Sequence, residues 1–248
     1  MTRRRWIADE VSDKQAALID DHADHLVRVL RARVGQDFDI VTGAVVRRGR
    51  IIAIAPTRVE FELLEEVPSA RNSEIVLLLS IFKFDRMEWA IEKCTELGVS
   101  EILPVIARRT DSHLAAASLK RLERWRKIAL QAAEQSRRVS PPQIESPTKL
   151  AQAIGQKAGL RIVLDESEHQ SQLRDALHSI KDKVVLAIGP EGGWADDETK
   201  LFLQAGWFPA TLGETILRAE TAAIAATVLA VSSRSPLLHE RKAGENQV

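Results

Sequence analysis

The chain has 248 residues, of which 45% are hydrophobic and 28% charged, and its 35 basic and 35 acidic residues give a formal net charge of zero. This composition is typical of a globular protein with enough apolar material for a buried core. No run approaches the roughly 20 apolar residues that cross a bilayer, which argues against a membrane-spanning helix. The single cysteine, Cys94, excludes an internal disulfide. No apolar signal segment follows the first arginines, so we expect a cytoplasmic protein.

The basic residues are unevenly distributed although the net charge is zero. They cluster at residues 3–5, 47–50, 120–127 and 137–138. Local clusters of this kind can bind phosphate groups even in a neutral protein. The alternative is that each cluster is a solvated face of a helix or hairpin, and the charge pattern alone leaves both interpretations open.

Residues 1–70 are predicted to form a small β-domain. Short runs rich in β-branched residues lie at 38–42, 45–54 and 58–64. Glycine and proline punctuate these runs, which favours a small barrel of short strands. One helix is expected over 22–31, because Leu26, Val29 and Leu30 then share a face. The polar stretch 65–73 is predicted to be a linker.

From residue 73 the pattern changes to alternating strands and helices. Strands are predicted at 75–81, 102–107, 160–164 and 184–188 and near 211, and helices at 84–97, 118–137, 172–180, 197–205 and 219–231. Such alternation predicts a parallel α/β sheet, which we assign to a second domain over 73–240. Residues 241–248 are polar and are expected to form a flexible tail.

Three predicted strand ends carry the residues most typical of a ligand site, because ligands of parallel sheets bind at the carboxyl ends of the strands. These segments are LDES at 164–167, IGPEGG at 188–193 and LGETILRAETA at 212–222. The glycines allow close backbone approach to a ligand. Neither a P-loop nor a Rossmann fingerprint is present, so the glycine loop alone is generic. The polar start of the last helix indicates either a ligand contact or a salt bridge of Arg218 with Glu220 or Glu191.

The second and third segments, in this order, closely resemble the RsmE family of 16S rRNA uridine-N3 methyltransferases. Further stretches agree with that family: DRME at 85–88, KCTELGV at 93–99, EQSRR at 134–138, and HLVRVLR at 25–31 with Gly35. The resemblance covers nearly the whole chain. It implies a PUA-like β-barrel, which would bind RNA, followed by a SPOUT methyltransferase domain with a trefoil knot.

The resemblance also implies S-adenosylmethionine as cofactor, a homodimer, and 16S rRNA or the small ribosomal subunit as substrate. By resemblance, the cofactor-binding residues are Leu164, Gly189, Pro190, Glu191, Gly192, Gly193, Leu212, Gly213, Ile216, Leu217, Arg218, Thr221 and Ala222. The expected RNA-binding residues are Arg3, Arg4, Arg5 and Arg31. No metal is expected, since His22 and His25 lack further ligands and are interpreted as a solvated face.

Methylation of uracil N3 sets chemical demands on the site. N3 lies on the pairing edge, so the base must be unpaired or extruded. Loss of the N3 proton spreads negative charge onto the flanking carbonyl oxygens, which a guanidinium would stabilise. Our hypothesis assigns this catalytic role to Arg137 or Arg138, with Arg218 as the third candidate. Glu134 and Glu220 are possible bases, or equally salt-bridge partners.

Other interpretations stay open. The same fold could methylate another base or a ribose 2′-hydroxyl, or the chain could be a non-catalytic ribosome assembly factor. A nucleotide-binding enzyme is disfavoured by the missing phosphate motifs. Cys94 is expected in the core. Core or rim positions are expected for at least three of Trp89, Trp125, Trp194 and Trp207.

Overall fold

The computed structural model of the chain describes residues 5–43, 45–68, 74–178 and 182–234. Its contacts divide the chain into two units, the first made of 1–72 with 129–141 and the second of 73–128 with 142–248. Segment 129–141 therefore groups with the amino-terminal unit, which the sequence pattern did not indicate. Arg3, Arg4 and the expected tail lie outside the described residues.

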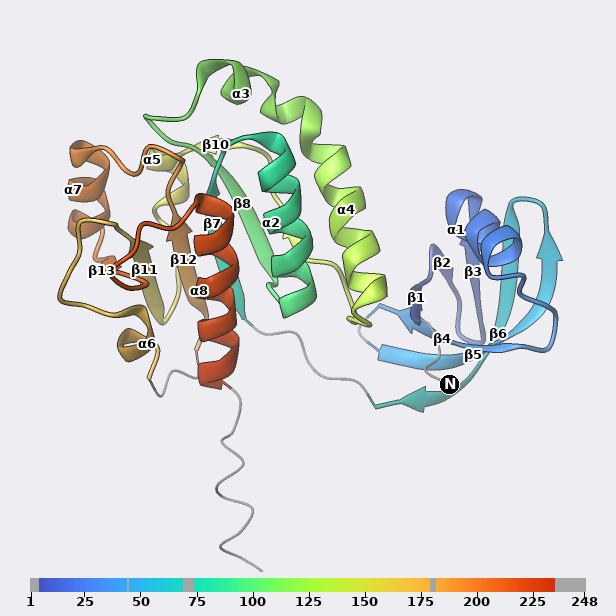
Figure 1. Cartoon of the computed structure of the whole chain (residues 1–248). Helices are drawn as coiled ribbons and strands as arrows, with labels where there is room; N and C mark the ends of the chain where they lie inside the picture. The colour runs from blue at the N-terminus through green and yellow to red at the C-terminus, as the bar shows by residue number, and fades with distance from the viewer. Residues whose placement is uncertain (1–4, 44, 69–73, 179–181, 235–248) are drawn as a thin grey trace, which may run out of the picture. The chain divides into compact units, whose positions relative to one another are not determined.

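The first unit is built on a curled six-stranded sheet (Figure 1) with the order β1-β4-β5-β6-β3-β2. Its strands are β1 (Arg5–Ile7), β2 (Glu10–Val11), β3 (Gln15–Ile19), β4 (Asp37–Thr42), β5 (Val45–Ala55) and β6 (Arg58–Val67). Strands β1 and β4 pair in parallel, and the other described strand pairs of this sheet are antiparallel. Two register shifts between β5 and β6 bend this long hairpin, as bulges do.

The predicted helix over 22–31 is confirmed in part and has two forms. The α-helix α1 (Asp20–Asp24) continues as a π-helix, η1 (His25–Val29). The predicted linker from residue 65 is wrong at its start, because β6 continues to Val67, which pairs with Val46. Backbone pairing with β5 keeps residues 65–67 in a strand although their composition is polar. The core of this unit contains Leu26 and Phe61.

The second unit is a parallel sheet with the order β10-β8-β7-β12-β11-β13, and β9 pairs with β8. Its strands are β7 (Ile75–Ser80), β8 (Glu101–Ile106), β9 (Gln143–Ile144), β10 (Thr148–Lys149), β11 (Leu160–Leu164), β12 (Val184–Ile188) and β13 (Phe208–Ala210). Every residue of β7 and β12 is buried. Strands covered on both faces read as continuous apolar runs, which is why the sequence predicted them.

Helices cover both faces of this sheet (Figure 1), with α2 and α8 on one face and α5 and α7 on the other. The helical elements are α2 (Phe84–Leu97), α3 (Ser112–Ala117), the 3₁₀ turn η2 (Ser118–Arg121), α4 (Leu122–Gln135), α5 (Leu150–Ala153), α6 (Leu173–Ala176), α7 (Asp196–Gln204) and α8 (Ala219–Arg234). Within the described ranges, every helix is too short or too polar to traverse a bilayer.

Two predicted helices differ from the structure. The helix expected over 172–180 begins only at Leu173, because Gln172 forms a β-bridge with Thr211, and α6 ends at Ala176; residues 179–180 lie outside the described residues. The helix expected over 118–137 begins as a 3₁₀ turn and ends at Gln135. Gly98 ends α2 in the left-handed region, as predicted.

The predicted core positions are confirmed. Cys94 is buried, and so are Trp125, Trp194 and Trp207. Trp89 is the exposed tryptophan among the four considered. Burial raises the pKa of the Cys94 thiol to about 12, so this group is not a nucleophile in the folded protein.

Candidate active site

The three predicted loops meet in one cavity of about 540 Å³ at the carboxyl edge of the parallel sheet. The first loop follows β11, the second follows β12, and the third runs from the end of β13 to the start of α8. Arg86 from α2, Arg109 after the end of β8, and Asp196 and Thr199 from α7 also line it. The arrangement agrees with the rule that ligands bind where parallel strands end.

The glycine loop after β12 is closely packed against its neighbours. A Cβ on Gly189 would lie 3.3 Å from the indole nitrogen of Trp194. Gly193 has a φ of +68°, and a Cβ there would lie 3.0 Å from a carboxylate oxygen of Glu166. Both positions therefore favour glycine, and both glycines line the cavity.

Hydrogen bonds hold the three loops together. The Trp194 indole donates to the Leu164 carbonyl at 3.0 Å and so joins the first and second loops. The backbone N–H of Asp165 donates to the Ala210 carbonyl at 3.0 Å, which joins the first loop to the strand that precedes the third. The cavity is therefore a connected structure in which each loop limits the movement of another.

Arg86 links the glycine loop to the start of α8. Its guanidinium lies 2.5 Å from Glu191 and 3.7 Å from Glu220. Glu220 is only 3% exposed, and its second carboxylate oxygen has no hydrogen bond within the described part of the chain. The salt-bridge interpretation for Glu220 is thus confirmed with Arg86 as the partner, and the alternative in which Arg218 pairs with Glu220 or Glu191 is not observed among the described residues.

Arg218 lines the cavity and is exposed. Its guanidinium forms no hydrogen bond or ion pair with any other described residue. Arg109, by contrast, donates to the Gly192 carbonyl at 2.8 Å. Arg218 is therefore the arginine of this cavity that is available to a ligand.

The structure brings most of the predicted cofactor-binding residues together. Those that line the cavity are Leu164, Gly189, Pro190, Glu191, Gly193, Leu212, Gly213, Ile216, Leu217, Arg218 and Ala222. Gly192 and Thr221 are not part of the lining. Sequence reasoning missed Arg86, Arg109 and His169. Arg109 follows the strand β8, so its position at a strand end was the available signal.

Arg137 and Arg138 belong to the first unit, whereas Arg218 belongs to the second. Arg138 is 8% exposed, and this burial lowers its pKa to about 10. Arg137 is exposed and lines a different cavity. The predicted RNA-binding residue Arg5 is buried and donates to the Arg137 carbonyl, and loss of hydration lowers its pKa. Arg31 is exposed.

Comparison with known proteins agrees with this site. Residues 69–231 match the family model of the RNA methyltransferase domain. Ribosomal RNA small subunit methyltransferase E of Mycobacterium tuberculosis is 31% identical over 91% of this chain and 90% of its own length. The corresponding enzyme from Neisseria gonorrhoeae, solved with S-adenosyl methionine, has 31% identity and a TM-score of 0.80, covering 91% of this chain and 95% of its own. A putative methyltransferase from Legionella pneumophila, solved in complex with the same cofactor, has 28% identity and a TM-score of 0.83, covering 94% and 98%.

The matched domain, together with a glycine-lined cavity at the edge of a parallel sheet of the SPOUT type, defines an RNA methyltransferase. Within that class, the chain belongs to the ribosomal RNA small subunit methyltransferase E family. The family resemblance and the fold class expected from the sequence are confirmed.

Proposed function

We propose that the protein transfers a methyl group from S-adenosylmethionine to N3 of a uridine in small-subunit ribosomal RNA. The observation that carries this proposal is the joining of three strand-end loops into one cavity lined by backbone and by the available guanidinium of Arg218. Two structural relatives are solved with this cofactor, which supports its assignment to the same region of this chain.

The lining of the cavity fits the cofactor. Its volume of about 540 Å³ lies in the range of small-molecule sites. Carboxylates of Asp165, Glu166 and Glu214 line it, which suits a ligand with a sulfonium and an ammonium group and disfavours one rich in phosphate. The bare backbone at Gly189 and Gly193 suits contacts to an adenosyl group.

The cofactor supplies an electrophilic methyl group on its sulfonium. The protein must hold the uracil in line with that methyl group and stabilise the charge that develops when the N3 proton leaves. Arg218 suits this role because its guanidinium is exposed in the cavity. Arg137 and Arg138 stay predicted participants, but the burial of Arg138 favours a structural role.

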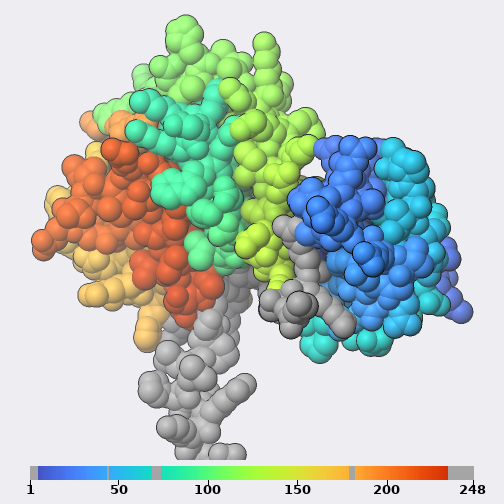
Figure 2. All heavy atoms as spheres, turned by 45° about the vertical axis from the view of Figure 1, so that its right-hand side comes forward, coloured from blue at the N-terminus to red at the C-terminus, as the bar shows by residue number. Residues whose placement is uncertain are grey.

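We further propose that the protein works as a homodimer in the cytoplasm. Helix α8 has apolar residues around most of its surface, and such a helix is normally covered. Trp89 on α2 and Val228 on α8 have exposed side chains. These two helices pack against each other (Figure 2). A second copy of the chain suits this surface. We expect sedimentation to show a dimer, which Val228→Lys weakens; a wild-type monomer at micromolar concentration would contradict this proposal.

The decisive test of the activity uses purified protein, unmodified small ribosomal subunits and labelled S-adenosylmethionine. We expect one methyl group on N3 of one uridine, located by mass spectrometry of nuclease fragments. Label on a ribose or on another base would favour the alternative methyltransferases. Absence of cofactor binding in calorimetry would favour a non-catalytic assembly factor.

A further inference from the structure

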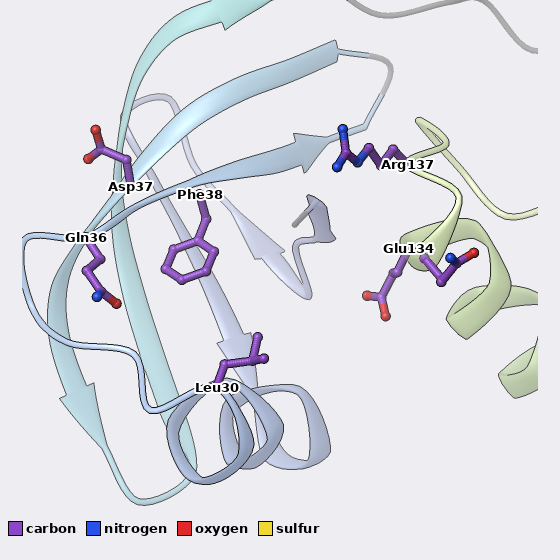
Figure 3. A pocket seen from close by; sticks show the side chains of 7 residues that line it. Leu30, Gln36, Asp37, Phe38, Glu134 and Arg137 are labelled. Atoms are coloured by element: carbon purple, nitrogen blue, oxygen red, sulfur yellow. The ribbon is translucent and has the colours of Figure 1, made fainter. Parts of the chain in front are cut away.

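A second cavity of about 630 Å³ lies within the first unit, apart from the residues of the proposed cofactor site. Its lining comes from the loop after η1, from strand β4 and from the carboxyl end of α4 (Figure 3). The lining residues are Leu30, Gln36, Asp37, Phe38, Glu134, Gln135 and Arg137. None of them lines the cofactor cavity of the second unit.

One side of this cavity is apolar and includes an aromatic ring. Figure 3 shows Phe38 and Leu30 on the side of the barrel, with Glu134 and Arg137 across from them. The Phe38 ring packs edge-to-face against Phe61, with centroids 6.3 Å apart, which fixes its orientation. Aromatic rings held in this way are common stacking platforms for unpaired bases.

Hydrogen-bonding groups line the cavity from both sides, with Gln36 and Asp37 on the side of the barrel and Glu134 and Arg137 across from them (Figure 3). The side-chain oxygen of Gln36 accepts from the Arg33 backbone N–H at 2.9 Å, so its amide nitrogen is the group left to donate. Arg137 supplies further donors and Glu134 supplies an acceptor. Asp37 is neutralised by Arg50, whose Nε lies 2.9 Å away, so it does not repel an anionic strand. This combination suits the edge of a nucleobase.

The backbone at Arg137 points to a role for its side chain. Its φ is +60°, a left-handed conformation that favours glycine over other residues. The buried guanidinium of Arg5 donates to the Arg137 carbonyl and holds this conformation. An arginine at a position that favours glycine indicates a function for the side chain.

Cations suited to phosphate groups lie next to the cavity in the sequence. Arg31 and Arg33 belong to the loop that joins Leu30 to Gln36, and both are exposed. Neither guanidinium forms an ion pair with another described residue. Phosphate contacts of this kind position a nucleic acid, while the contacts to base edges provide specificity.

We propose that this cavity binds one unpaired nucleobase of the ribosomal RNA substrate, with the flanking phosphates on Arg31 and Arg33. The base is a different one from the methylated uridine, whose chemistry belongs to the second unit. The identity of the ligand as RNA rests on the proposed function. In this role Arg137 determines substrate specificity.

The test measures binding of the full-length protein to unmodified small-subunit ribosomal RNA. We expect Arg137→Gln and Gln36→Glu each to weaken binding about tenfold, the lower range for loss of one base contact. Arg174→Gln, at an exposed arginine of the second unit, is the matched control and should bind as the wild type does. Arg137→Lys should recover only part of the affinity, because it keeps the charge and loses the planar guanidinium.

Ultraviolet crosslinking locates the contact directly. We expect the peptide containing Phe38 to carry a crosslinked nucleotide in the wild type and to lose it in Arg137→Gln. Wild-type affinity of Arg137→Gln and Gln36→Glu, full recovery with Arg137→Lys, or no crosslink at Phe38 would each overturn the proposal. A wild type that binds RNA at this cavity without methylating it would refute the proposed function alone. If the protein methylates the RNA but the variants bind as the wild type does and Phe38 gives no crosslink, only the proposed base-binding role of this cavity is refuted.

Discussion

Arg218 differs from the other two arginines of the cofactor cavity, because Arg86 is paired with carboxylates and Arg109 with a carbonyl. Its guanidinium is available for charge that develops on the substrate. We expect Arg218→Ala to lower the rate of methyl transfer about 100-fold, as the loss of one oxyanion donor does. Single-turnover transfer of labelled methyl groups measures this effect. A rate within threefold of the wild type would exclude the proposed role.

Gly193 lies in the glycine loop after β12. Substitution by alanine adds one methyl group there and tests whether the loop needs its present backbone conformation. Its left-handed backbone and the closeness of Glu166 leave no relaxed place for a Cβ. We expect Gly193→Ala to weaken binding of S-adenosylmethionine at least about tenfold in calorimetry, because distortion of the loop disturbs its backbone contacts. The matched control is Gly155→Ala, where a Cβ meets nothing within 4 Å. Equal affinity in both variants would refute this explanation.

At the scale of elements, Arg86 connects α2, the glycine loop and α8 through its two carboxylate partners. Arg86→Gln leaves the buried Glu220 without its nearby cation. We expect the free energy of unfolding to fall by about 1–3 kcal/mol, the cost of an uncompensated buried polar group. Denaturant unfolding measures this change. Addition of Glu220→Gln should restore part of the loss, whereas additive losses would contradict the coupling.

The elements that the sequence predicted well are those with strong local patterns. Strands β7 and β12 are continuous apolar runs, and α2 carries apolar residues at helical spacing. Strands β9 and β10 have two residues each and leave no periodic signal. The start of α6 was placed one residue early because Gln172 is bridged to Thr211, which is distant in sequence.

The candidate site could be predicted where it follows strand ends. The glycines after β12 and the segment before α8 were found because parallel strands end at one edge of a sheet. Arg86 was not assigned, because it enters the cavity from a helix over 100 residues away from its partner Glu191. For the same reason, the sequence could not show that Arg86, and not Arg218, pairs with Glu191 and Glu220.

At the scale of the whole molecule, sequence patterns did not indicate that 129–141 groups with the amino-terminal unit. The cause is that contacts between distant segments decide the grouping. The trefoil knot, which only the family resemblance implies, likewise has no periodic signature and stays a prediction. The predicted RNA-binding role of the barrel stays a prediction, which the cavity at Arg137 makes testable.

Stability at alkaline pH is a further property of the whole fold. Burial raises the pKa of Cys94 from 9.0 to about 12, so the folded chain keeps a proton that the unfolded chain releases. We therefore expect the free energy of unfolding to decrease as pH rises above about 9, where the unfolded thiol ionises. Cys94→Ala should reduce this part of the slope in denaturant titrations at pH 8 to 10. An identical pH dependence in both proteins would contradict the assignment.

The bond from the Trp194 indole to the Leu164 carbonyl has a practical consequence. This indole lines the cofactor cavity, whereas Trp125 and Trp207 are buried and are not part of its lining. Arrival of a ligand changes the polarity around one intrinsic fluorophore, so emission can report occupancy without any label. Subtracting the signal of Trp194→Phe then isolates that reporter from the remaining tryptophans.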